Sequence, residues 1–76
     1  MKQHIYILDY FFKDDKLSHI LKVRKASIVE FQSWDSEIRF EGDYKIVRDC
    51  QSWHDSNFEN FAHHDKFVKN DFELFK

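Results

Sequence analysis

The chain has 76 residues, with 12 Lys or Arg against 14 Asp or Glu, so its formal net charge at pH 7 is −2. An apolar fraction of 42% with so small a net charge excludes an intrinsically disordered chain, which is poor in apolar residues and carries a large net charge. There is no Pro and only one Gly, so no segment has the composition of a flexible linker. The sequence therefore predicts one compact domain over residues 1–76.

Two features of the sequence bear on the cellular compartment. The single cysteine, Cys50, cannot form an internal disulfide, which is typical of a reducing compartment. The first residues, MKQHIYILDYFFKDD, hold one Lys and a short apolar run that Tyr and Asp interrupt, with no cleavage site of a signal peptide. No stretch approaches the roughly 20 apolar residues of a membrane span. We therefore expect a soluble cytoplasmic protein without membrane contact.

The first 25 residues predict a β-hairpin. Residues 3–12, QHIYILDYFF, are β-branched and aromatic without a helical period, and both of their alternating faces are apolar, as in an inner strand. The charged stretch KDDK at 13–16 favours a turn, because Asp tolerates turn conformations. Residues 17–25 then alternate as a second strand, with Leu17, Leu21 and Val23 on one face.

Residues 27–41 are compatible with two structures. Ser27 stands three residues before Glu30 at the start of an apolar run, which is the capping-box pattern, and apolar residues follow at helical spacing. This pattern favours a helix over about 28–37. The alternative is a pair of strands, SIVEF and EIRF, with Gly42 and Asp43 turning a hairpin into the next strand.

The remaining third of the chain predicts a strand followed by a helix. Residues 44–49, YKIVRD, alternate as a strand, and 50–55 form a connecting loop. Ser56 and Glu59 repeat the capping-box spacing, and the apolar residues from Phe58 onward share one helical face. We expect a helix from 57 to about 70, which continues towards the C-terminus unless Asn70 and Asp71 end it early.

Together these segments predict an α+β domain. An antiparallel sheet, built from the N-terminal hairpin and a strand near 44–49, carries one or two helices packed on it. The alternative is a five-stranded antiparallel meander plus a C-terminal helix. The expected core consists of Ile5, Ile7, Leu21, Val23, Ile46, Phe58, Phe61 and Val68.

The sequence contains no convincing catalytic or metal-binding pattern. Cys50 and His54 could form one pair of zinc ligands, but a structural site needs a second pair that converges with the first. His63 and His64 do not supply it, because adjacent helical residues point about 100° apart. Contiguous residues such as HDS at 54–56 cannot adopt the geometry of a nucleophilic triad. We therefore expect no catalytic residue, no cofactor, no metal and no enzymatic activity.

Nucleic-acid binding is the alternative function. Five of the 12 basic residues lie on the predicted N-terminal hairpin, where Tyr6 and Tyr10 could stack on bases beside Lys22 and Arg24. Three Asp share this hairpin, however, and the whole chain is slightly acidic, whereas nucleic-acid-binding domains are strongly basic. We therefore expect nucleic acid to be a weaker candidate partner than protein.

The aromatic content favours protein binding. Nine Phe, three Tyr and two Trp are more aromatic side chains than so small a core accommodates, and exposed aromatics are typical anchors of protein interfaces. The sequence predicts a non-enzymatic protein-binding module whose partner is another protein or a second copy in a homodimer. By analogy of class alone, it would be an inhibitor or regulator of a host protein complex, of the kind that phages and mobile elements direct against bacterial defence such as CRISPR.

The predicted interface lies on the last helix. If this helix continues to about residue 75, Phe67 and Leu74 fall on the side opposite Phe58, with His63 and Asn70 beside them. A sheet cannot cover both sides of one helix, so these residues would form an exposed apolar surface. The competing prediction ends the helix at Asn70 and makes FELF at 72–75 an edge strand.

Overall fold

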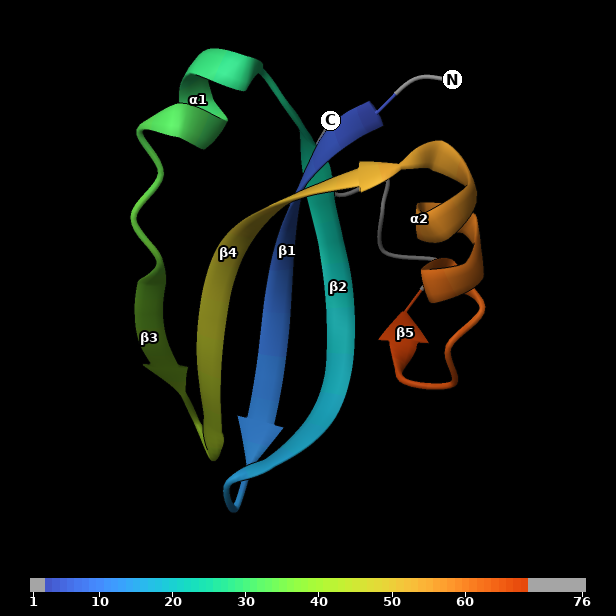
Figure 1. The fold of residues 1–76 in the computed structure, drawn as a ribbon. Coiled ribbons are helices and arrows are strands. Elements are labelled where there is room, and N and C mark those ends of the chain that lie inside the picture. Colours follow the sequence, from blue (N-terminus) through green and yellow to red (C-terminus); the bar gives the residue numbers. More distant parts are fainter. Residues whose placement is uncertain (1–2, 69–76) are drawn as a thin grey trace.

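The computed structural model describes residues 3–68, which form a twisted five-stranded sheet with two short helices (Figure 1). In the sheet the strands lie in the order β3-β4-β1-β2-β5; the first four are antiparallel, and β5 runs parallel to β2. This arrangement confirms the predicted α+β domain. The elements, in chain order, are β1 (Gln3–Lys13), β2 (Lys16–Ala26), α1 (Ile28–Gln32), β3 (Glu37–Glu41), β4 (Tyr44–His54), α2 (Asp55–Ala62) and β5 (Phe67–Val68).

The N-terminal hairpin forms as predicted. Lys13 pairs with Lys16 at the end of β1 and β2, and the two residues between them, Asp14 and Asp15, have φ angles of 53° and 62°. Positive φ at both central residues is the signature of a type I′ turn, whose twist matches that of the flanking strands. Asp is one of the few non-glycine residues that adopts this conformation readily.

β1 is the central strand, as its two apolar faces predicted. It pairs with β2 on one side and β4 on the other, and a cluster of buried side chains lies on each of its faces. One face, here called the α2 face, holds Tyr6 and Leu8, on which Phe58 of α2 packs. The opposite face, the α1 face, holds Ile5 and Ile7. Two helices therefore cover a sheet that has no polar side.

Residues 27–41 combine the two predicted alternatives. The capping box is present: the Glu30 N–H donates to Ser27 Oγ at 3.1 Å, and the Ser27 N–H donates to the Glu30 carboxylate at 3.4 Å. The helix it starts, however, ends at Gln32 and not near residue 37, because the chain then turns to pair with β4 as β3. Gly42, with a φ of +56°, opens the turn between β3 and β4, as the alternative reading expected.

The C-terminal part differs most from the prediction. β4 continues to His54, so the expected loop at 50–55 is mostly strand. α2 starts at Asp55 without a side-chain cap, so the predicted role of Ser56 as N-cap is wrong. The helix ends at Ala62, and Figure 1 shows the chain turning back from it to place β5 beside β2.

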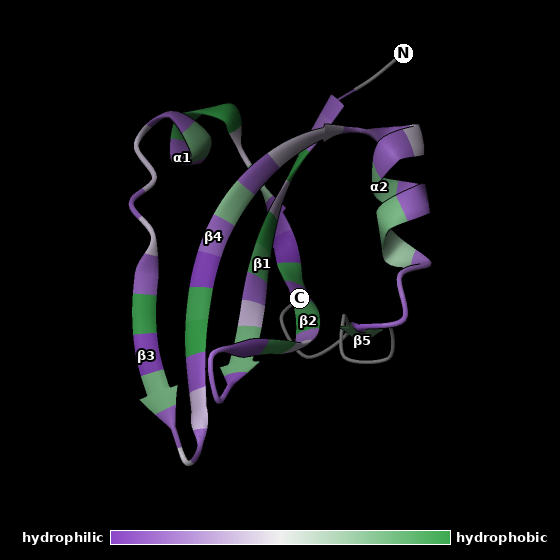
Figure 2. Ribbon diagram, turned by 60° about the horizontal axis from the view of Figure 1, so that its bottom comes forward, coloured by the Kyte–Doolittle hydropathy of each residue, from purple (hydrophilic) through white to green (hydrophobic). Residues whose placement is uncertain are grey.

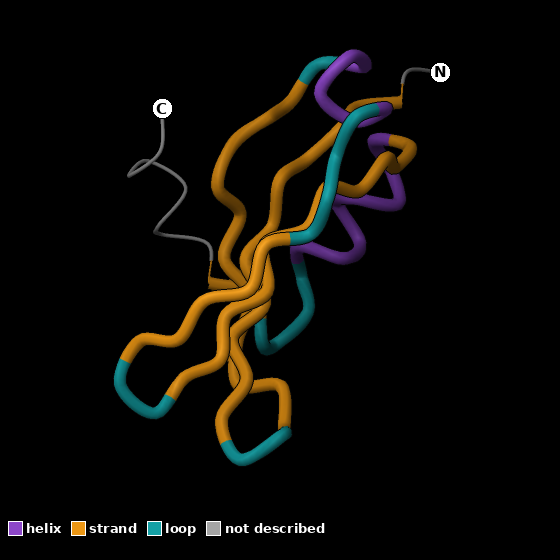
Figure 3. Tube along the Cα trace, turned by 90° about the vertical axis from the view of Figure 1, so that its left-hand side faces the viewer, coloured by secondary structure: helices purple, strands orange, loops and turns teal. Residues whose placement is uncertain are grey.

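Most of the predicted core is confirmed. Phe61 is half-buried and packs against the cluster on the α2 face, whereas the side chain of Val68 lies outside the described part of the structure. The predicted core residues that are buried are Ile5, Ile7, Leu21, Val23, Ile46 and Phe58. Both helices of residues 3–68 lie towards the end of the sheet that is opposite to the two hairpin turns, and neither of them covers the turn end of the sheet (Figure 3).

Candidate functional site

Phe67, which was predicted to lie in an interface on the last helix, is a buried residue of β5. Phe67 is 6% exposed and makes edge-on ring contacts with Phe58 and Phe61, at centroid distances of 5.9 and 5.5 Å. It is held there because the Ile20 N–H donates to the Lys66 carbonyl at 2.6 Å, which starts the pairing of β5 with β2. The placement of Phe67 on an exposed helical surface is therefore wrong.

The other three residues of that interface do not restore it. His63 is the exposed C-cap of α2 and not a residue of a continuing helix. Asn70 and Leu74 lie outside the described residues, as does the predicted strand FELF. Whether any of the four residues contacts a partner stays a prediction, but the helical surface that grouped them is absent from residues 3–68.

The residues predicted to contact nucleic acid do not form one platform. Tyr6 is buried and stacks on Phe58 with 3.8 Å between ring centroids, and the Lys22 amine lies 5.6 Å from the centroids of both rings. Arg24 is bound to Glu30 of α1 by hydrogen bonds of 2.6 and 3.1 Å. Tyr10 is half-buried, and burial raises the pKa of its phenol. Base stacking on Tyr6 would require α2 to move away.

Two titratable groups considered in the sequence, His4 and Cys50, have defined surroundings in the structure. His4 Nδ1 contacts the Asp55 carboxylate, and this hydrogen bond is the largest cause that lowers the pKa of Asp55. Cys50 is buried, and burial, followed by Asp49, raises the pKa of its thiol. Within residues 3–68, no three His, Cys, Asp or Glu side chains are arranged to hold a metal ion. No helix of this range is long and apolar enough to span a membrane.

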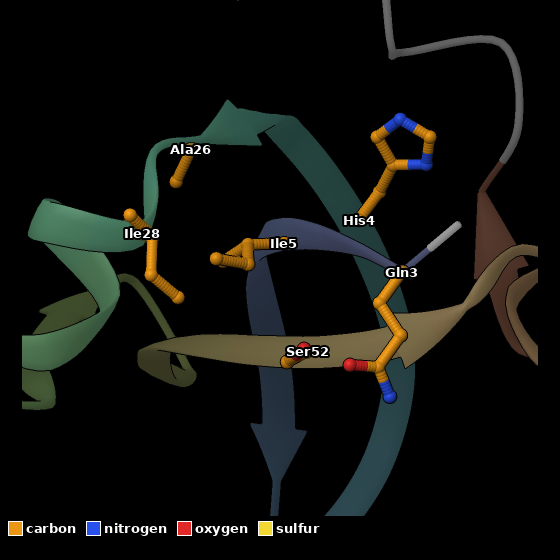
Figure 4. A pocket seen from close by; sticks show the side chains of 6 residues that line it. All are labelled: Gln3, His4, Ile5, Ala26, Ile28 and Ser52. Carbon is orange, nitrogen blue, oxygen red and sulfur yellow. The ribbon is translucent and has the colours of Figure 1, made fainter. Parts of the chain in front are cut away.

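An open pocket of about 360 Å³ lies at the end of the sheet where β1 begins (Figure 4). In this view Ile5 points towards Ile28 and Ala26, whereas the ring of His4 points away from them. The polar side chains that line the pocket are those of Gln3, His4 and Ser52, and Nδ1 of His4 is bound to Asp55, so the pocket lacks the convergent charged groups that orient a substrate. The pocket therefore gives no evidence for catalysis.

Four large apolar side chains of the described part are exposed, Ile28 and Val29 on α1 and Ile38 and Phe40 on β3. Ile38 and Phe40 of β3 are 58% and 74% exposed, and they alternate with the charged residues of the strand (Figure 2). Because side chains alternate along a strand, Ile38 and Phe40 share the α2 face of the sheet. There Ile38 stands beside Val47 of β4, which stands beside Tyr10 of β1. We call Ile38, Phe40, Val47 and Tyr10 the β3 patch.

The β3 patch borders a free strand edge. Among residues 3–68, β3 is the terminal strand of the sheet and pairs only with β4. Its two-residue turn closes on the pair Glu41 and Tyr44, which is the hydrogen-bonded pair of such a hairpin. Since hydrogen-bonded and non-bonded pairs alternate in an antiparallel ladder, the main-chain N–H and C=O groups of Ile38 and Phe40 point away from β4. The same two residues thus offer apolar side chains and unpaired main-chain groups.

Sequence reasoning did not identify this site. The alternation in EIRFE was visible as the lesser of two readings, but a strand only becomes a free edge once the order of strands is known. Comparisons with protein-family models, with curated proteins and with solved structures found no match to this chain. The candidate site therefore depends on the geometry of β3 alone.

Proposed function

We propose that this protein is a non-enzymatic protein-binding module that uses the β3 patch and the free edge of β3. The observation that supports the proposal is the 74% exposure of Phe40 on a terminal strand whose outer edge pairs with no other strand of residues 3–68. Single exposed apolar residues are normal on protein surfaces. Here, however, Phe40 and Ile38 lie on the same face of the same edge, next to half-buried Tyr10 and Val47, which makes the exposed apolar surface continuous.

The expected mode of binding is addition of a strand to the sheet. An incoming strand would hydrogen-bond to the main-chain groups of Ile38 and Phe40, which provide affinity without sequence preference. Alternate side chains of that strand would then pack on the β3 patch and provide specificity. By occupying a partner in this way, a domain of this size would act as an inhibitor or regulator of a protein complex.

The test is affinity capture from the lysate of the source organism, with nuclease added. Phe40→Glu places a charge in the β3 patch. Val29→Glu makes the same kind of change on α1, where the Val29 side chain is 69% exposed. We expect the wild type and Val29→Glu to retain the same protein and Phe40→Glu to lose it. Circular dichroism should show that all three are folded. Equal capture by Phe40→Glu, or capture that nuclease abolishes, would contradict the proposal.

A further inference from the structure

We infer that the strand which adds to β3 is β3 of a second copy of this chain, paired antiparallel about a twofold axis at Phe40. This inference deepens the proposed function and rests on it. Its basis is the order of charges along β3, where Glu37, Arg39 and Glu41 all project from the α1 face. Because an isologous interface sets each residue against the residue related to it by the axis, only some registers bring opposite charges together.

The register centred on Arg39 is unfavourable. It would set Arg39 opposite Arg39 of the second copy, and Glu37 opposite Glu41 of the second copy, so every cross-strand pair on the α1 face would repel. Like charges that stand directly opposite each other in a sheet are destabilising. Arg39 is also engaged within its own chain, where it donates to the buried Asp9 at 3.3 Å.

The register centred on Phe40 is favourable on the same face. It sets Arg39 of each copy opposite Glu41 of the other, which gives two opposite-charge pairs. Arg39 Nε already donates to Glu41 within one chain at 3.2 Å. The two arginines and two glutamates would therefore form one closed network. Glu37 would face the turn residue Asp43 beyond the end of the strand, where solvent screens the repulsion.

The α2 face favours the same register over the one centred on Ile38. With Phe40 on the axis, Phe40 of one chain packs against Phe40 of the second copy. Phe40 is the most exposed apolar side chain of the described residues, and aromatic pairs across strands are stabilising. Ile38 then faces Gly42 of the second copy, and a Cβ built on Gly42 meets no atom within 4 Å, so there is room for the isoleucine. With Ile38 on the axis, Phe40 would face the polar Ser36 instead.

Sedimentation velocity over a range of protein concentrations tests for the second copy. We expect the wild type to form a dimer, Phe40→Glu to remain a monomer, and Val29→Glu to form a dimer like the wild type. The two variants change side chains of similar exposure, so a general effect of added charge would appear in both. A wild type that stays monomeric up to about 1 mM would overturn the inference.

Charge reversal tests the register. Glu41→Arg should raise the dissociation constant about tenfold or more, because two attractive pairs become repulsive. Glu59→Arg makes the same charge change on the exposed surface of α2 and should have no effect. Arg39→Glu should also abolish the homodimer. An equimolar mixture of Glu41→Arg with Arg39→Glu should restore a dimer, since every pair at the axis is then of opposite sign.

The outcomes separate the inference from the proposed function. If the wild type is a monomer, or if the dimer survives both Phe40→Glu and Glu41→Arg, the second copy is not the occupant of β3. In that case the proposed function still stands if Phe40→Glu loses the captured protein. If the mixture fails to restore a dimer while both single variants are folded, the register centred on Phe40 is wrong and the inference fails.

Discussion

Arg48 donates two hydrogen bonds to the carboxylate of Asp9, from Nε to Oδ1 at 2.8 Å and from a terminal nitrogen to Oδ2 at 3.0 Å. Asp9 is fully buried in the central strand, and Arg48 stands directly opposite it on β4. Arg39 of β3 adds a third hydrogen bond at 3.3 Å. The bond to Asp9 is the largest cause that raises the pKa of Arg48. A buried carboxylate without such partners would be very unfavourable, so Asp9 and its two arginines link β1, β4 and β3 in one register.

Arg48→Met should destabilise the domain strongly. Removing one partner of a buried ion pair leaves an uncompensated charge and typically costs about 3 to 5 kcal/mol. Arg39→Met should cost much less, because the Arg39 side chain is 40% exposed and contributes one longer bond to Asp9. Urea denaturation of the two variants measures the difference. If both variants lose the same free energy of unfolding, Arg48 is not the main partner of Asp9.

Phe58→Ala should lower the free energy of unfolding by about 3 to 5 kcal/mol, as expected for a buried aromatic. Phe58 stacks on Tyr6 and meets Phe67 edge-on, so truncation removes both ring contacts and leaves a cavity. Phe40→Ala is the matched control and should change the stability of the monomer by no more than about 0.5 kcal/mol, because Phe40 is exposed. Thermal or urea unfolding at low protein concentration distinguishes them. A large loss in Phe40→Ala would contradict its placement on the surface.

Acid should weaken the contact between α1 and β2. The hydrogen bond from Arg24 is the largest cause that lowers the pKa of Glu30 below its ordinary value of 4.5, followed by the Ser27 N–H. A carboxyl whose pKa is lower in the folded state stabilises the fold above its unfolded pKa, and this contribution is lost as the pH falls through the folded pKa.

Glu30→Gln should therefore lose less stability than the wild type between pH 5 and pH 3. The loss should not vanish, because Asp55, whose pKa is lowered by His4, also contributes in this range. Unfolding curves collected at several pH values give the free energy of unfolding as a function of pH for the wild type and for Glu30→Gln. Parallel curves for the wild type and Glu30→Gln would show that the Arg24–Glu30 pair contributes nothing to the folded state.

The Cys50 thiol should react slowly in the native protein. It is buried, and burial is the largest cause that raises its pKa, so little of the reactive thiolate is present near pH 8. Alkylation followed by mass spectrometry should be much slower in buffer than in concentrated urea, where the strand is unfolded. If Cys50 is alkylated at the same rate in buffer and in urea, β4 opens readily around Cys50.

Local chemistry in the sequence was sufficient for the N-terminal half of the fold. The alternation of QHIYILDYFF, with apolar residues on both faces, identified a central strand, and two Asp residues identified the turn that follows. The spacing of Ser27 and Glu30 identified the start of α1. Each of these signals acts between residues close in the chain, so it is the same in the sequence and in the folded protein.

The ends of the helices depended on contacts that are distant in the chain. The apolar period from Phe58 onward was consistent with one long helix, on which the side chain of Phe67 would have been exposed on the opposite side. In the fold, pairing of β5 with β2 ends that period after Ala62 and buries Phe67. Short helices are marginal on their own, so tertiary pairing decides where they stop.

The sequence by itself determined the class of the fold, the central hairpin and most of the core, because these follow from periodicity, turn chemistry and capping within short segments. Only the tertiary structure decided that β3 is the terminal strand of the sheet formed by residues 3–68 and that Ile38 and Phe40 are exposed in it. The same alternating sequence would be buried in the middle of a sheet. The physical reason is that strand order and helix placement arise from long-range pairing, which fixes which apolar residues remain accessible to a partner.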